Sequence, residues 1–251
     1  MFDNPTMEDN AINIDDLDET IYRIFPINWF TDLIKTRTNG LVNPAKWDDP
    51  FENFFLKNMA ALPDGTIVSL ASISEGWYGQ CWTRNEDSDA MWRIYSKDKT
   101  GVRVATTIRA LFSSFYNTSE KFASLKYLIG SVSYIKRQEI ERFLSTTSFT
   151  DLALGGQPHN FAKTLLMKRP EFSHENEVRL LFHDSENNNG KDGVATFRFP
   201  WEDVISGIAL DPRLSDSEFD AERQKIISLG CHLPISQSEL YKFTPTIIRL
   251  S

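Results

Sequence analysis

Two glutamates two positions apart are the strongest candidates for chemistry in this chain. Glu175 and Glu177 stand at the start of a run, residues 177–182, that alternates polar and apolar side chains and then becomes continuously apolar. Because successive side chains of a strand point to opposite faces, the pair would lie on one side, followed by Arg179. Like charges on one face repel, so such a pair indicates either a solvated strand edge or a functional site. The sequence leaves both interpretations open.

An arginine inside an apolar, strand-like run is the second candidate. Arg23 follows Tyr22 in the β-prone segment 21–25, and a guanidinium is costly to bury without a partner. Its forked donors could grip two oxygens of a phosphate. The alternative is an arginine on the solvent face of an edge strand, and the sequence alone favours that alternative.

A hydroxyl residue and nearby aromatic residues form the third candidate. Thr83 ends a predicted strand over residues 78–83, and Trp92 and Tyr95 fall on a predicted helix that begins after Asp89. A hydroxyl and flat rings that face one cavity would suit a ribose and a stacked heterocycle. Aromatic residues at helical spacing more often pack into a core, and this alternative also stays open.

The turn-like segment from Trp47 to Glu52 is a further candidate. Its Asp-Asp-Pro sequence at 48–50 is typical of a turn, and Pro50 is well placed to open a helix. The segment could floor a pocket, but a capped turn with an aromatic anchor is the simpler interpretation.

The periodicity of the remaining chain predicts the elements that must hold these residues. It indicates an α+β fold with a split or mixed sheet in a single domain over residues 21–251. Residues 1–20, rich in Asp, Glu and Asn, predict a flexible acidic arm. Strands are expected at 21–25, 67–72, 78–83, 102–106, 127–135, 177–182, 195–199, 205–210, 233–235 and 247–250. Helices are expected from 27 to the Asn-Gly pair at 39–40, then at 50–59, 89–95, 108–116, 137–144, 161–170 and 217–229.

Composition and charge exclude several classes of protein. The 251 residues are 41% hydrophobic and 25% charged, which excludes a collagen-like, disulfide-rich or wholly disordered chain. A net charge of −8 gives no general attraction for nucleic acid or anionic lipid. The 2 cysteines and 4 histidines are scattered, so no metal site is expected. Without a signal-peptide pattern or a membrane-spanning run, the expected location is cytoplasmic with no membrane partner.

Taken in order, the candidate segments resemble a bacterial family known as domain of unknown function 2971. That family's pattern runs from a Tyr-Arg pair through Asn-Asp-Pro-Phe-Glu, a Cys-Phe-Ser-like strand end and Met-Trp-x-x-Tyr to Glu-x-Glu-x-Arg-Leu. Each piece is weakly specific alone, but the ordered set covers nearly the whole chain after the arm. The matching residues are Tyr22-Arg23, Asp48-Asp49-Pro50-Phe51-Glu52, Cys81-Trp82-Thr83, Met91-Trp92-Arg93-Ile94-Tyr95 with Gly101, Glu175-Asn176-Glu177-Val178-Arg179-Leu180 and, in the tail, Ile208-Ala209-Leu210-Asp211-Pro212 and Ser238-Glu239-Leu240-Tyr241.

A wider resemblance bears on mechanism. The order of arginine, hydroxyl strand end and Glu-x-Glu is similar to the Arg-Ser-Glu signature of the ADP-ribosyltransferase superfamily. The resemblance implies that superfamily's split mixed sheet with flanking helices, and NAD as co-substrate without a metal. The arginine would bind the NAD phosphates or adjacent ribose, the hydroxyl would support the nicotinamide ribose, and a helix aromatic would pack on nicotinamide. By this resemblance the cofactor-binding residues are Tyr22, Arg23, Thr83, Trp92 and Tyr95.

The same resemblance makes Glu177 catalytic and places Glu175 nearer the acceptor. Breaking the nicotinamide–ribose bond develops positive charge on the ribose, which a carboxylate would stabilise. A second carboxylate near the acceptor could take its proton. One departure from the signature is Thr83 in place of the usual serine, which keeps the hydroxyl but could change the loop.

The function expected from these resemblances is transfer of ADP-ribose from NAD to a macromolecular acceptor, protein or nucleic acid, or hydrolysis of NAD. Bacterial toxins and phage-defence effectors occur in the superfamily, and such a role would imply a cognate inhibitor or immunity protein as partner. The alternative is a non-catalytic module on the same fold that binds a nucleotide or a partner. A nucleic-acid enzyme unrelated to NAD is a third hypothesis, which the acidic charge balance disfavours.

Overall fold

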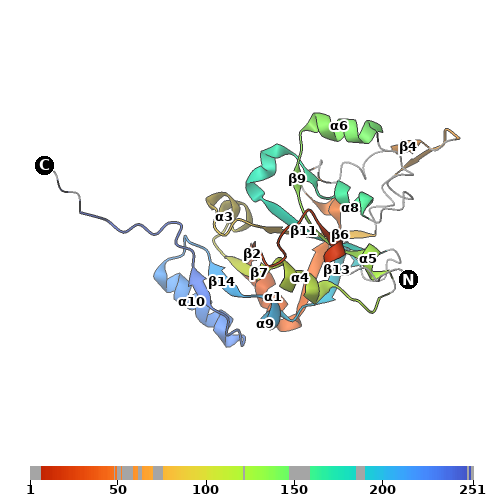
Figure 1. The fold of residues 1–251 in the computed structure, drawn as a ribbon. Coiled ribbons are helices and arrows are strands. Elements are labelled where there is room, and N and C mark those ends of the chain that lie inside the picture. Colours follow the sequence, from red (N-terminus) through yellow and green to blue (C-terminus); the bar gives the residue numbers. More distant parts are fainter. Residues whose placement is uncertain are drawn as a thin grey trace.

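Eleven strands form one branched, mixed sheet that holds most of the chain together (Figure 1). The computed structural model describes residues 7–47, 49, 52, 59–61, 64–69, 76–120, 122–146, 159–184, 190–247 and 249. The strands of the sheet are β1 (Ala11–Ile12), β2 (Thr20–Pro26), β3 (Thr38–Val42), β6 (Trp77–Thr83), β7 (Gly101–Thr107), β8 (Tyr127–Ser131), β11 (Glu177–His183), β12 (Gly190–Lys191), β13 (Val194–Arg198), β14 (Gly207–Leu210) and β15 (Ile235–Gln237). The α+β class with a mixed sheet and flanking helices is therefore confirmed.

Short helices and two small strand pairs flank this sheet. β9 (Ser133–Tyr134) pairs in parallel with β10 (Met167–Lys168), and β4 (Met59–Ala61) pairs antiparallel with β5 (Ile67–Ser69). Among the described residues, no helix combines the length and the apolar character needed to cross a membrane. The helices are η1 (Glu8–Asn10), α1 (Ile27–Thr36), η2 (Pro44–Lys46), α3 (Asp89–Tyr95), α4 (Ile108–Phe115), α5 (Ala123–Lys126), α6 (Arg137–Thr146), α8 (Asn160–Thr164), η4 (Pro170–Glu175), α9 (Trp201–Val204) and α10 (Asp216–Ser228).

The sheet divides at β6. One edge of β6 pairs with β11 along its whole length, from Thr83 opposite Glu177 to Trp77 opposite His183. The other edge is shared, because β2 pairs with it only at Thr83 and β3 only at Gly79. β2 and β3, joined through α1, therefore diverge from one another and leave an opening beside β6. This branched pairing of β6 is the cause of the split in the sheet.

The central strand β11 explains why its sequence turns continuously apolar. Its first six residues are all buried, as expected for a strand covered on both faces. Phe182 packs edge-on against Phe115 of α4, with ring centroids 6.0 Å apart, and also against Tyr127 of β8. Burying such rings contributes about 1.5–3 kcal/mol each. The core thus holds rigid the strand that carries the candidate glutamate.

The N-terminal segment differs from the flexible arm expected over residues 1–20. Ala11 and Ile12 form β1, which pairs in parallel with β8, and Ile12 packs into an apolar cluster with Leu128. The fully buried Asn10 side chain donates hydrogen bonds to the carbonyl oxygens of Ser124 and Tyr127. The arm description therefore does not hold for residues 7–20, because a few apolar and amide side chains outweigh the acidic composition. Residues 1–6 lie outside the described part.

Other boundaries also differ from the expectations. The first helix ends with Arg37 in a left-handed conformation (φ 54°), so residues 39–40 lie inside β3 and do not close the helix. Met59 lies in a strand, whereas the expected helix at 50–59 otherwise falls outside the described residues apart from Glu52. Of the strand expected at 67–72, residues 67–69 are described and form β5.

Candidate active site

A cavity of about 630 Å³ opens where the sheet divides, between β2 and β6. This volume lies in the range of small-molecule sites in proteins. α3 closes one side, and the segment that leads from β10 through η4 into β11 closes another. Six of the seven residues singled out from the sequence line this cavity. They are Tyr22, Arg23, Thr83, Tyr95, Glu175 and Glu177.

Trp92 is the exception. Its side chain is fully buried in a small core cluster with Ile24 and Met91, away from the cavity lining. Its indole N–H donates a hydrogen bond of 2.6 Å to Asp87. Tyr95, three residues further along α3, has a different environment: it is 40% exposed and lines the cavity. The core interpretation of the aromatic spacing therefore describes Trp92, and the cavity interpretation describes Tyr95.

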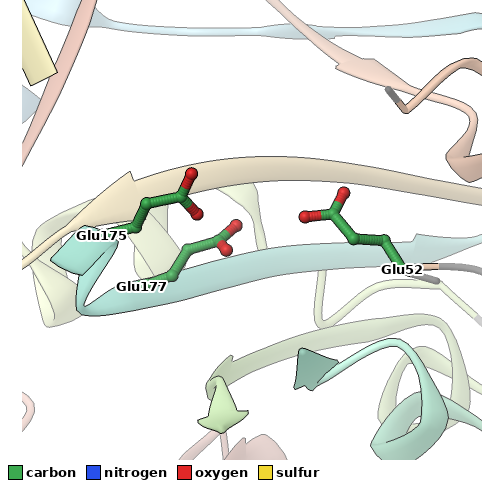
Figure 2. A group of neighbouring side chains, drawn as sticks. All are labelled: Glu52, Glu175 and Glu177. Atoms are coloured by element: carbon green, nitrogen blue, oxygen red, sulfur yellow. The ribbon is translucent and has the colours of Figure 1, made fainter. Parts of the chain in front are cut away.

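Three carboxylates converge at the β11 side of the cavity (Figure 2). Glu52, Glu175 and Glu177 are all buried, and one oxygen of each lies within 4.8 Å of the others. The ammonium of Lys168 stands among them: its Nζ lies 2.5 Å from Glu52 Oε1 and 3.4 Å from Glu177 Oε2, and it forms an ion pair with Glu175. The position that a bound cation would take is thus already held by a side chain of the protein.

Arg179 is the second cation of this cluster. Its Nε lies 2.8 Å from Glu177 Oε1, and its Nη2 lies 2.9 Å from Glu177 Oε2 and 3.0 Å from Glu52 Oε1. The remaining Nη1 donates to the carbonyl of Leu165, and the guanidinium lies 4.5 Å from the Trp47 ring centroid. Arg179 is fully buried, and each of its three nitrogens donates at least one hydrogen bond. With all groups ionised, three carboxylates and two cations leave one excess negative charge.

The two glutamates of the pair differ in proton affinity. Burial by itself would raise the pKa of Glu177, but Arg179, followed by Lys168 and a hydrogen bond from Cys81, outweighs burial and the pKa is lowered. Burial raises the pKa of Glu175, and its ion pair with Lys168 opposes the rise only in part. Glu177 therefore stays ionised, and Glu175 is the group more ready to accept a proton.

The backbone explains why the two carboxylates lie together. Glu175 ends η4, Asn176 adopts a left-handed conformation (φ 43°), and Glu177 opens β11. The pair therefore does not sit on one strand as expected from the spacing. The left-handed residue turns the chain so that both side chains still point the same way in Figure 2. Asparagine tolerates this conformation better than most residues.

Thr83 holds this turn in place. Its hydroxyl donates to the backbone carbonyl of Glu175 and accepts the backbone N–H of Asn85, at 3.1 Å. The N–H of Arg84 donates to the carbonyl of Asn176, at 3.0 Å. The hydroxyl is thus engaged with the chain itself, and its visible effect is to fix the Glu175 backbone beside β6.

Arg23 lies on the opposite, β2 side of the cavity. Its guanidinium lies 5.2 Å from the Phe25 ring centroid, and burial lowers its pKa. The groups that oppose this effect are the Cys81 thiol and the Tyr95 phenol. Within the described part of the chain, no carboxylate forms an ion pair with Arg23. An anion in the cavity would provide the missing counter-charge.

Sequence reasoning missed two members of the charge cluster. Glu52 belongs to the Asp-Asp-Pro-Phe-Glu motif at 48–52, but its link to the glutamate pair spans more than a hundred residues. Lys168 carries no motif at all. The pairing of β10 with β9 sets it opposite Tyr134, whose hydroxyl accepts the backbone N–H of Glu177 at 3.0 Å. Only this pairing brings Lys168 to the cluster.

Trp47 is a further lining residue with a structural requirement of its own. It packs over Gly79 of β6, where a Cβ atom would lie 2.7 Å from the Trp47 ring. Glycine at this position lets the indole approach the strand and cover Arg179. The aromatic-anchor interpretation of this segment and the pocket-floor interpretation therefore both describe Trp47. Asp48, Pro50 and Phe51 lie outside the described residues.

Comparison with known proteins gives a family model and several solved structures. The model described as "Protein of unknown function (DUF2971)" matches residues 91–180, a segment that contains Tyr95, Lys168, Glu175, Glu177 and Arg179. The resemblance to this family is thereby confirmed over that segment. No curated protein matches the chain.

The solved structures come from Thermus sp. 2.9. DarT in complex with NAD+ is 11% identical, with a TM-score of 0.41 over 91% of this chain and 99% of that chain. DarT in complex with ADP-ribosylated ssDNA is 10% identical, with a TM-score of 0.42 over 92% and 99%. DarT in complex with carba-NAD+ is 12% identical, with a TM-score of 0.39 over 88% and 96%. At this distance the likeness assigns no residue role to this chain.

Proposed function

We propose that this chain is an ADP-ribosyltransferase-like enzyme that uses NAD, either transferring ADP-ribose to a macromolecule or hydrolysing NAD. One observation carries the proposal: Arg23, Tyr95, Glu175 and Glu177 come from three separate parts of the sequence and line one cavity. Dispersed positions would have left only a binding module or an unrelated function. The cavity volume also suits a small-molecule ligand, and the lining offers a cation at Arg23 and carboxylates at Glu175 and Glu177.

The residues would divide the work by charge. Arg23, at the cationic end, would bind the pyrophosphate and orient the ligand. Tyr95, partly exposed on α3, would pack on a flat ring of the ligand. Glu177, held ionised by Arg179, would stabilise positive charge that develops on the ribose. Thr83 would act through the backbone of Glu175 and not on the ribose directly.

The transfer step balances without a metal or a redox partner. The bond that breaks joins ribose C1′ to the nicotinamide nitrogen, and its electron pair leaves with nicotinamide. The bond that forms joins C1′ to a nucleophilic atom of the acceptor, or to water in hydrolysis. Glu175, whose pKa burial raises, would take the proton that this nucleophile loses.

The experiment that tests the proposal follows nicotinamide release from NAD. We expect Glu177→Gln to keep its fold and NAD affinity while losing turnover by roughly 10²–10³-fold, the effect of losing one preorganised charge in a transition state. Release that requires cell lysate would indicate a transferase, and release without lysate an NAD hydrolase. Full activity of Glu177→Gln, or an absence of both NAD binding and nicotinamide release by the parent protein, would refute the enzyme.

A non-catalytic binding module is the second candidate, and one observation favours it. Both oxygens of Glu177 already accept from Arg179, and the Thr83 hydroxyl is bonded within the chain. A site saturated in this way could bind a nucleotide without turning it over. NAD binding by calorimetry with no nicotinamide release, in the presence or absence of lysate, would establish this candidate.

The proposed setting is the bacterial cytoplasm, where the free thiols of Cys81 and Cys231 would stay reduced. A toxin or phage-defence effector of this kind should slow the growth of a bacterial host when it is produced there. Glu177→Gln is the matched control, because it removes the negative charge of this side chain and keeps its shape. Equal growth with both proteins would count against the toxin role but not against the enzyme.

A further inference from the structure

Lys168 is the one buried cation that connects all three carboxylates of the site in the described structure. It forms ion pairs with Glu52, Glu175 and Glu177, and its ammonium also lies 4.7 Å from the Phe172 ring centroid. The residue lies in the two-residue strand β10, seven positions before Glu175. Nothing in its sequence context indicates this role.

The arrangement of partners makes Lys168 unequally important to the three acids. Arg179 already forms ion pairs with Glu177 and Glu52. Among the described residues, Glu175 has Lys168 as its sole ion-pair partner. Three carboxylates within 4.8 Å of one another cannot all stay ionised at neutral pH without compensating charge. Removal of the lysine would therefore act first on Glu175.

We propose, given the function argued above, that Lys168 is a positioning residue that keeps Glu175 ionised and directed toward the cavity, ready to take the acceptor's proton. The ammonium supplies the positive charge that a buried carboxylate needs. It donates a hydrogen bond to Oε2 of Glu175 and not to Oε1. Lys168 would not itself react, because its carboxylate partners hold its pKa well above the ordinary value and the amine stays protonated.

The other titratable groups near Glu175 support this assignment. Glu177 is held ionised first by Arg179 and to a smaller extent by Lys168. Burial raises the pKa of Tyr134 to about 12, and burial likewise raises the pKa values of Tyr95 and the Cys81 thiol, so these three groups stay neutral near pH 7. Glu52 faces Lys168 from the far side and shares Arg179. Glu175 is thus the member of the cluster best placed to change its charge.

The test compares Lys168→Met with Lys168→Arg, and uses the exposed Lys163→Met of α8 as matched control. Electrostatics gives the direction of the expected shift. Loss of the cation raises the pKa of Glu175, so as the pH falls the carboxylate becomes protonated at a higher pH than in the parent protein. We expect the acid limb of kcat/KM in Lys168→Met to move up by about one pH unit or more, a roughly 10-fold loss below that limb. Lys168→Arg should restore most of the wild-type profile.

A second measurement does not depend on turnover. The infrared band of a protonated carboxyl group should appear near pH 7 in Lys168→Met, and vanish when Glu175→Gln is added. Lys168→Gln provides the same measurement should the methionine variant fail to fold. An unchanged pH profile and no new band in folded variants would overturn the inference. If the infrared band appears but neither the parent protein nor any variant releases nicotinamide, the proposed function is refuted, while the effect of Lys168 on Glu175 is supported.

Discussion

Two arginines near the cavity have contrasting surroundings: Arg23 lines it on the β2 side, whereas Arg179 does not line it but pairs with Glu177, which does. Arg179 on β11 is fully buried, and its donors reach Glu177, Glu52 and a backbone carbonyl. Arg23 on β2 keeps a small exposed fraction, and no described carboxylate forms an ion pair with it. Arg179 therefore completes an ionic cluster beside the cavity, whereas Arg23 places a positive charge at the β2 wall without a described counter-charge.

The contrast between the two arginines gives the cavity two ends of different charge. A saturated arginine adds stability and holds a carboxylate in place, while an unsaturated one attracts an anion from solution. The β2 wall thus suits the anionic part of a ligand, and the β11 wall suits a part on which positive charge develops. A ligand that has both ends would be oriented by the cavity alone.

Loss of each arginine should have a very different effect on the stability of the protein. Arg179→Met should destabilise the protein by about 3–5 kcal/mol, because it leaves Glu177 and Glu52 buried with less compensating charge. Arg23→Met should change the free energy of unfolding by less than about 1 kcal/mol, because it breaks no ion pair. Urea unfolding of both variants measures the contrast. Equal losses would show that Arg23 is a structural residue like Arg179.

A smaller effect concerns ligand affinity. Arg23→Gln should weaken NAD or pyrophosphate binding by roughly 10- to 100-fold, the usual contribution of a charge-assisted contact, while the fold is kept. Arg23→Lys should recover only part of the loss, because an ammonium cannot grip two oxygens as a fork. Calorimetry at fixed ionic strength measures both variants. Unchanged pyrophosphate affinity in Arg23→Gln would remove the anionic end from the proposed site.

A still smaller effect concerns the turn between η4 and β11, which Thr83 holds in place. Thr83→Val keeps the shape but removes the hydrogen bond to the Glu175 carbonyl, and should cost about 1 kcal/mol of stability. Turnover should fall by less than roughly 10-fold, since the hydroxyl acts on the backbone. Thr83→Ser should behave like the parent protein in thermal unfolding and nicotinamide release. A loss of turnover as large as that of Glu177→Gln would instead assign Thr83 to direct ligand contact.

Local patterns in the sequence were sufficient to predict many of the strands and helices of this protein. Strand and helix periodicity predicted β2, β6, β7, β11 and α4 close to their observed bounds, because each buries one face or both. The order of Arg23, Tyr95, Glu175 and Glu177 singled out a candidate site through its resemblance to the Arg-Ser-Glu signature, since each residue type alone left a structural alternative open. The bounds of single elements depend on residues close together in the chain.

Features that depend on distant segments were decided by the tertiary structure alone. Lys168 joins the glutamate pair only because β10 pairs with β9, and Glu52 joins it only through its contacts with Lys168 and Arg179, which are far away in the sequence. The left-handed Asn176, and not strand alternation, brings the two carboxylates together. Likewise the buried Asn10 and Ile12 tie an acidic segment to β8.

The physical reason is the same in each case. Periodicity records which side of an element is buried, but it does not record what lies across from that side. Trp92 and Tyr95 sit one turn apart on α3, yet the first packs into the core with Ile24 and the second faces the cavity. Their environments depend on the branching of the sheet at β6, which pairs with β2 and β3 at single positions. The sequence determined the chemical groups, and the branched sheet decided which of them meet.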